Sequence, residues 1–262
     1  MARTLGQDLA AALRFYSRLP LPARDETAFA APDIDRIAYA VPVAGAVLGL
    51  IGALVLILAM ALKLPAFLAA TLAVTALALA TGCFHEDGLA DTADGLGGGR
   101  DRIHKLTIMR DSRIGTYGAT ALLLGLLLRI GALEALAVSV GPLRAGFALI
   151  AGEAASRAAG VLLIAALPPA RTDGAGASVG RPSEAAALSC ALVAALIVAV
   201  LMVASFGIGA AFAGLIGPVL VLLVMMRLSA RLIGGQTGDV AGATQQVAVI
   251  VFLLGVLIFG GR

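Results

Sequence analysis

Seven long apolar stretches alternate with short polar segments along the chain. Each stretch is long enough to cross roughly 30 Å of hydrocarbon as a helix. The pattern therefore predicts an all-α fold, a polytopic integral membrane bundle of about seven transmembrane helices in a single membrane-embedded domain over residues 1–262. The expected spans are residues 37–62, 65–84, 115–133, 136–167, 185–206, 208–226 and 243–259.

The amino-terminal segment, residues 1–36, has a different pattern. Leu5, Leu9, Leu13 and Tyr16 recur at helical spacing, and polar residues fill the positions between them. This periodicity predicts an amphipathic helix that lies in the membrane interface. The segment has no apolar core next to its start, so we do not expect a signal peptide.

Composition supports the membrane prediction. Of 262 residues, 60% are hydrophobic and 13% are charged, whereas soluble domains average roughly 25% charged residues. The net charge is only +3 and no basic stripe with interleaved aromatic residues is present, so we expect no nucleic-acid partner. Cys83 and Cys190 lie in apolar surroundings without metal-site spacing, so neither a zinc site nor a disulfide is expected.

The fourth apolar stretch, residues 136–167, decides the topology because it is longer than one crossing requires. A single crossing puts the loop of Arg171 and Arg181, residues 84–114 and residues 227–242 on one side of the membrane. Two crossings would separate residues 227–242 from the rest and violate the bias of basic loops toward the cytoplasm. We therefore expect seven spans, with the amino terminus and these polar loops in the cytoplasm.

The densest polarity lies in residues 84–114. If the chain around position 87 is helical, Asp87, Asp91 and Asp94 lie at i, i+4 and i+7 on one narrow face. Carboxylates this close repel one another, so the arrangement favours a hard divalent cation among them, with Mg²⁺ as the expected ion. The alternative interpretation is a solvated helix face.

Basic residues follow the acidic run directly, at Arg100, Arg102, Lys105, Arg110 and Arg113. Cationic side chains beside cation-binding acids are what a phosphate-bearing substrate requires. The two groups together indicate a site for phosphoryl transfer.

A second polar motif occupies residues 234–239 and is rich in glycine. Gly238 would let the backbone approach a phosphate or a metal closely, and Asp239 could add a carboxylate. The alternative interpretation of Asp239 is that it only caps a loop.

Four segments, residues 84–95, 108–118, 234–243 and 15–20, resemble cobalamin synthase, the adenosylcobinamide-GDP ribazoletransferase family. The resemblance extends over nearly the whole chain, and its two long motifs are specific. It implies a magnesium-dependent enzyme of the bacterial inner membrane, active on the cytoplasmic side. Such an enzyme joins adenosylcobinamide-GDP to alpha-ribazole or its 5'-phosphate and releases GMP.

The resemblance also implies roles for single residues. Asp87, Asp91, Asp94 and Asp239 would hold magnesium, and Glu86 is a further candidate ligand. These carboxylates would neutralise, through the ion, the charge that develops on the departing GMP.

Phosphate oxygens would be bound by Arg110, Arg113 and Arg157, together with Lys105 and the Gly238 loop. Arg110 stands where lysine is expected in many relatives, which keeps the charge but changes its geometry.

Two side chains have competing interpretations. Arg157 follows Glu153 by four residues, so it binds substrate or forms an internal ion pair. His85 is a candidate base, or it stabilises a helix end. Arg129 and Arg144 are expected near the far membrane interface, where long side chains can reach water.

Two other classes of protein deserve comparison. A CDP-alcohol phosphotransferase also has clustered aspartates, but its signature fails here because Asp87-Gly88 is followed by Leu89-Ala90-Asp91. An ion-coupled transporter should carry its acids in mid-membrane on discontinuous helices. The many small residues in the spans permit helix packing within one chain or in a homo-oligomer.

Overall fold

The computed structural model describes residues 4–21, 32–172 and 179–260, and all regular elements in these ranges are helices. The predicted all-α class is therefore confirmed. In chain order the helices are α1 (Leu5–Tyr16), α2 (Ile34–Ile37), η2 (Ala38–Ala40), α3 (Val41–Ala61), α4 (Ala66–Thr81), α5 (Phe84–Gly98), α6 (Arg102–Ile108), α7 (Thr116–Val140), α8 (Pro142–Ala166), α10 (Glu184–Phe206), α11 (Ile208–Ile233) and α12 (Gly238–Gly260).

Six helices are individually long and apolar enough to span a membrane, and they include α3, α7, α8, α10, α11 and α12. The helices α4 and α5 meet the same criterion only as a pair, and they are bent by 89° at their junction. The described residues thus hold six continuous candidate spans, and the bent pair α4–α5 makes a seventh if its two helices cross as one span, in agreement with the prediction of about seven.

The break between α4 and α5 has a local cause. Gly82 (φ 64°) and Cys83 (φ 57°) both adopt the left-handed conformation, which ends a right-handed helix. The expected span 65–84 therefore stops at Thr81. The acidic residues begin on a new helix with its own direction.

The boundary between the third and fourth spans was predicted at the wrong place. The helix α7 continues to Val140, and the chain turns at Gly141, which has φ 87°. Pro142 then starts α8, because its fixed φ suits the first turn of a helix. Glu134, which interrupts the apolar pattern, lies inside α7 rather than in a link. The helix α8 is one helix, as expected for a single crossing.

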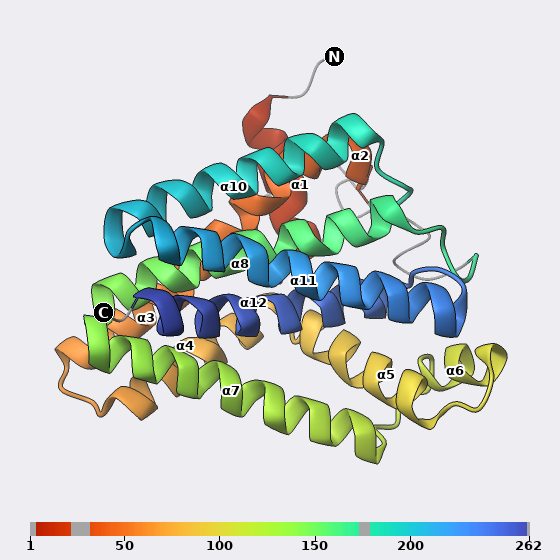
Figure 1. Cartoon of the computed structure of the whole chain (residues 1–262), viewed down its shortest axis with the longest axis horizontal. Coiled ribbons are helices and arrows are strands. Elements are labelled where there is room, and N and C mark those ends of the chain that lie inside the picture. The colour runs from red at the N-terminus through yellow and green to blue at the C-terminus, as the bar shows by residue number, and fades with distance from the viewer. Residues whose placement is uncertain (1–3, 22–31, 173–178, 261–262) are drawn as a thin grey trace.

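Figure 1 shows the long helices running across the view, with α6 and several polar connections at one end and the carboxyl terminus at the other. The helix α8 lies in the interior, and most of its residues are buried. Close packing depends on small residues, because a Cβ at Gly49 of α3 would lie 2.7 Å from Ile150 Cα of α8.

The helix α1 forms where the periodicity predicted it. Its Leu13 and Tyr16 are buried in the same core as the bundle, whereas Leu5 is 75% exposed. Part of the apolar face that we expected to face lipid therefore packs against protein. Asp8 is also buried and accepts hydrogen bonds from Arg36 Nε (3.2 Å) and Tyr39 Oη (2.9 Å).

Candidate active site

The acidic helix α5 confirms the expected helical geometry of the first motif. Asp87 is exposed, Asp91 is half-buried and Asp94 is buried, at positions i, i+4 and i+7 of one helix. Glu86 and Asp87 lie in its first turn, where negative charge stabilises a helix.

The first turn of α12 lies directly against α5. A Cβ at Gly88 would lie 2.8 Å from the Asp239 carbonyl oxygen, and one at Gly242 would lie 3.5 Å from His85 Cα. Only glycine at position 88 permits this backbone-to-backbone approach. It brings Asp239 to the acidic face, where Asp91 is within electrostatic range of Asp87, Asp94 and Asp239.

Arg171 is a site residue that the sequence analysis did not assign. Its guanidinium Nη2 lies 3.0 Å from Asp239 Oδ2, and it also opposes the negative charge around Asp91. The only usable clue in the sequence was topological, since a single fourth crossing places the Arg171 loop on the side of the acidic motif.

Two backbone hydrogen bonds fix the position of the Arg171 loop. Gln236 N donates to Pro168 O (2.8 Å), and Ala170 N donates to Gln236 O (2.7 Å). Gly235 leaves no room for a side chain against Pro168 O. The glycine-dense motif therefore serves to dock this loop beside the start of α12.

The carboxylates fit a hard cation by their chemistry but do not converge around one point. Among the described residues, no group of three or more His, Cys, Asp or Glu side chains is placed to hold a metal ion. The oxygens of Asp94 accept hydrogen bonds from Gly115 N (2.7 Å) and Gly118 N (2.8 Å) at the start of α7. Asp87, Asp91 and Asp239 remain as the oxygen donors that suit Mg²⁺.

Glu86 points away from these donors into the bundle. Its Oε1 accepts a hydrogen bond from Gln246 Nε2 (2.9 Å) and lies 3.6 Å from Arg129 Nη1. Arg129 pairs in turn with Glu153, which also pairs with Arg157. Glu86 thus belongs to a buried charge network, defined here as Glu86, Arg129, Glu153 and Arg157.

The network overturns one expectation and decides another. Arg129 is only 2% exposed, so its expected place at the far interface is wrong; Arg144 is exposed as expected. Arg157 is equally buried, and its ion pair with Glu153 supports the internal interpretation over substrate binding. The two acids and two arginines balance, as charges within a membrane bundle must.

His85 is fully buried beneath α1. Its ring stacks on that of Tyr16, with centroids 5.8 Å apart and planes 1° apart. This buried position disfavours the role of a base, and the structure shows ring stacking on Tyr16 rather than the expected stabilisation of a helix end.

The remaining predicted phosphate-binding residues fall into different places. Lys105 Nζ donates to Leu96 O (2.9 Å) and to Gly99 O, and so caps the end of α5. Arg113 forms an exposed pair with Asp111 (2.5 Å), and this pair lowers the pKa of the Asp111 carboxyl to about 2. Arg110 is exposed after α6, and Gly238 is the half-buried first residue of α12.

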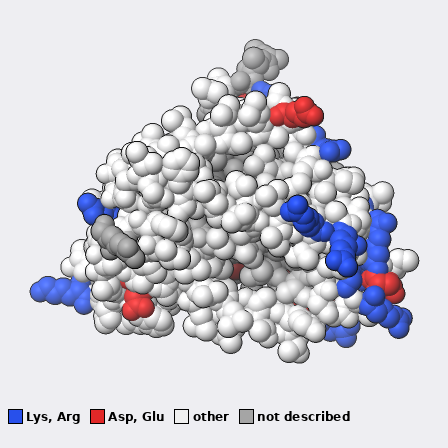
Figure 2. Space-filling view, in the orientation of Figure 1, with Lys and Arg blue, Asp and Glu red and all other residues white. Residues whose placement is uncertain are grey.

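Figure 2 shows that the lysine and arginine side chains on the viewed face gather mainly at the end of the bundle that carries α6 and the polar loops. The carboxylates of Asp87, Asp91 and Asp239 come together from α5 and α12, with Arg171 beside them. The class of protein that this combination defines is a polytopic membrane enzyme acting on a phosphate-bearing substrate.

The chain belongs to the cobalamin-5-phosphate synthase family, whose family model matches residues 8–257. A protein of Xanthobacter autotrophicus named adenosylcobinamide-GDP ribazoletransferase is 74% identical over 260 residues, covering 98% of each chain. A protein of the same name from Azorhizobium caulinodans is 59% identical, and the match covers 96% of each chain. Another of that name, from Mesorhizobium japonicum, is 46% identical over 96% of this chain and 93% of its own length. No solved structure matches.

These comparisons confirm the resemblance seen in the two polar motifs. The chain is an enzyme of the family that performs the final step of cobalamin biosynthesis.

Proposed function

We propose that this protein transfers the adenosylcobinamide-phosphate group of adenosylcobinamide-GDP to alpha-ribazole or its 5'-phosphate. A ribose hydroxyl of the acceptor attacks the phosphorus next to cobinamide and loses its proton. The bond from that phosphorus to GMP breaks, and GMP leaves with the electron pair. The close approach of α5 and α12 at Gly88, which puts Asp239 beside Asp87 and Asp91, is the observation that best supports this reaction here.

The carboxylates Asp87, Asp91 and Asp239 would hold Mg²⁺, which neutralises negative charge on a diphosphate when it is bound. Arg171 holds the Asp239 carboxylate in place by their ion pair. Asp94 orients α5 against α7 through its two backbone hydrogen bonds. Arg110 and Arg113 lie exposed on the α6–α7 connection, where their charges can attract the anionic substrate.

The proposed location is the bacterial inner membrane, with the site at the cytoplasmic face. The arginine-rich amino-terminal segment and the gathering of basic side chains at the end that carries α6 support this location, because basic loops favour the cytoplasm.

The test is GMP release by purified, detergent-solubilised protein given adenosylcobinamide-GDP and alpha-ribazole 5'-phosphate, with and without Mg²⁺. We expect metal-dependent release by the natural chain and a fall of at least about 100-fold in Asp91→Asn, since lost charge stabilisation of about 2.7 kcal/mol corresponds to this factor. Glu134→Gln, in the interior of α7, serves as the control.

Both variants should unfold at the temperature of the natural chain. Metal-dependent release that survives in Asp91→Asn would remove this carboxylate from the site. No release with any divalent metal would contradict the proposed reaction itself.

A further inference from the structure

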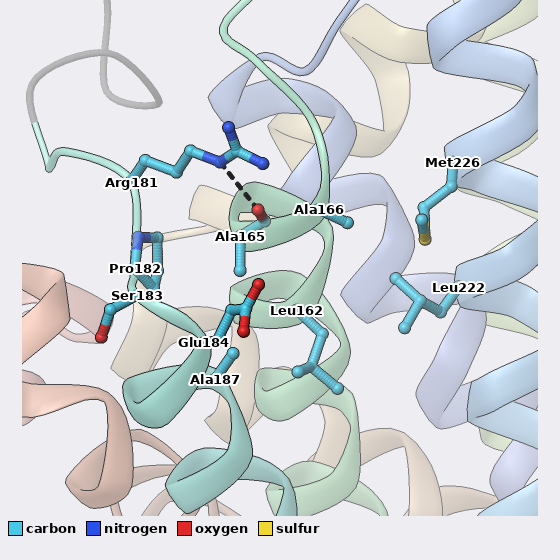
Figure 3. A pocket seen from close by; sticks show the side chains of 10 residues that line it. All are labelled: Leu162, Ala165, Ala166, Arg181, Pro182, Ser183, Glu184, Ala187, Leu222 and Met226. Atoms are coloured by element: carbon cyan, nitrogen blue, oxygen red, sulfur yellow. Dashed lines mark hydrogen bonds between the residues drawn. The ribbon is translucent and has the colours of Figure 1, made fainter.

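A groove opens where α8, α10 and α11 meet, and Figure 3 shows the residues that line it. Its volume is about 570 Å³, within the roughly 300–1,000 Å³ that ligand sites occupy. In Figure 1, α10 and α11 join at Gly207 and diverge toward the end of the bundle that carries α6, and the groove lies in this divergence.

The two sides of the groove differ in polarity. Arg181, Ser183 and Glu184 lie at the start of α10, near the last turn of α8. Leu222 and Met226 line the opposite side of the groove, on α11, where Met226 lies across from Ala166 in Figure 3. One side of the groove is therefore charged and the other apolar, so the groove offers separate contacts to the head group and to the acyl chain of an amphiphile.

A hydrogen bond to α8 holds Arg181 at the charged side of the groove. Its Nε donates to the carbonyl oxygen of Ala165 (2.8 Å), an acceptor in the last turn of α8. Such end-of-helix carbonyls lack a partner within their own helix. The bond uses Nε, so the two terminal nitrogens of the guanidinium do not contact Ala165 (Figure 3). A guanidinium with its terminal nitrogens available can bind a phosphate.

Glu184 supplies the opposite charge on the same side of the groove, as the first residue of α10. It is exposed, and no ion pair between Arg181 and Glu184 occurs among the described residues. A ligand that carries both a phosphate and an ammonium group can therefore pair with both side chains. A purely anionic head group would meet the Glu184 carboxylate, and a quaternary ammonium has no hydrogen to donate to it.

We propose that this groove binds one phospholipid of the phosphatidylethanolamine class. Its phosphate contacts Arg181, its primary ammonium contacts Glu184, and an acyl chain lies along Leu162, Leu222 and Met226. The proposal is independent of the reaction proposed above, because none of these residues belongs to the carboxylate site.

Native mass spectrometry of the delipidated chain in detergent provides the test, with phosphatidylethanolamine, phosphatidylcholine and phosphatidylglycerol of identical acyl chains. We expect phosphatidylethanolamine to bind about tenfold more tightly than either other lipid, the factor that about 1.4 kcal/mol from one charged hydrogen bond provides. Glu184→Gln should abolish that preference, and Arg181→Gln should weaken binding of all three lipids.

Two further variants make the result decisive. Ala187→Phe places a ring in the groove and should block every lipid, whereas Arg144→Gln, exposed at the other end of the bundle, should bind as the natural chain does. Arg181 and Glu184 are exposed, so their variants should fold. Equal binding of the three lipids, or a preference that persists in Glu184→Gln, would overturn the proposal.

Discussion

Asp87 and Asp94 share one face of α5, yet their carboxylates have different surroundings. Asp94 accepts two backbone hydrogen bonds at the start of α7, at 2.7 and 2.8 Å, whereas Asp87 is exposed. Residue spacing alone treats the two as equivalent ligands. The structure separates an acid that joins two helices from an acid that is available to an ion.

This difference predicts that substituting Asp94 lowers the stability of the protein, whereas substituting Asp87 lowers its activity. Asp94→Ala should lower the free energy of unfolding by about 1–3 kcal/mol, because it leaves the buried N–H of Gly118 and the partly buried N–H of Gly115 without their acceptor. Asp87→Ala should leave unfolding unchanged and reduce GMP release. Thermal unfolding in detergent and the release assay measure the two effects, and equal destabilisation by both variants would contradict this assignment.

The buried charge network leads to a second prediction at this scale. Arg129→Ala should destabilise the protein by about 3–5 kcal/mol, because it leaves Glu86 and Glu153 with one arginine in the bundle interior. Arg144→Ala is the matched control, since Arg144 is exposed. If the two variants unfold at the same temperature, Arg129 does not hold the bundle together.

At the scale of helices, the site depends on how closely α5 approaches α12. Gly88→Ala should reduce GMP release strongly, because the new Cβ would lie 2.8 Å from Asp239 O and must push the two helices apart. Gly131→Ala in α7 is the control: a Cβ there meets nothing within 4 Å, so the variant should gain up to about 1 kcal/mol from helix propensity.

Release at the natural rate by Gly88→Ala would show that the spacing of α5 and α12 does not matter to the reaction. Loss of folding in Gly88→Ala, with Gly131→Ala still folded, would leave packing rather than the site as the explanation for the effect.

The helices themselves were largely predictable from the sequence, because apolar run length determines which segments can cross a bilayer. The helical face of Asp87, Asp91 and Asp94 was predictable for the same local reason, a fixed number of residues per turn. Helix ends were less predictable. The breaks at Cys83 and Gly141 depend on backbone conformations that apolar periodicity does not encode.

The sequence pattern did not predict which side chains pair with residues on other helices. Arg129 looked like an interfacial residue because it follows an apolar run, but Glu153 on another helix compensates its charge inside the bundle. Arg171 carried no motif, and only the docking of its loop on Gln236 places it beside Asp239. Lys105 looked like a phosphate ligand, yet it caps α5 from nine residues away.

At the scale of the whole molecule, the number of crossings decides on which side of the membrane each connection lies. If α4 and α5 cross together as one span, the α3–α4 and α6–α7 connections lie on opposite sides. Ser112, between α6 and α7, and Lys63, between α3 and α4, are both exposed and belong to different connections. In a Cys83→Ser background, an impermeant thiol reagent should label Ser112→Cys only in inside-out vesicles and Lys63→Cys only in right-side-out vesicles. Labelling of both from one side would exclude the broken crossing of α4 and α5.

The central claim is that carboxylates from α5 and α12 form one site, and a double-mutant cycle on GMP release tests it most directly. The cycle compares Asp91→Asn, Asp239→Asn and the double variant at saturating Mg²⁺. If the two residues act together, the double variant should be about as slow as the slower single variant, because each substitution already disables the shared site. Fold-losses that simply multiply would show that Asp91 and Asp239 act independently, and would contradict the account.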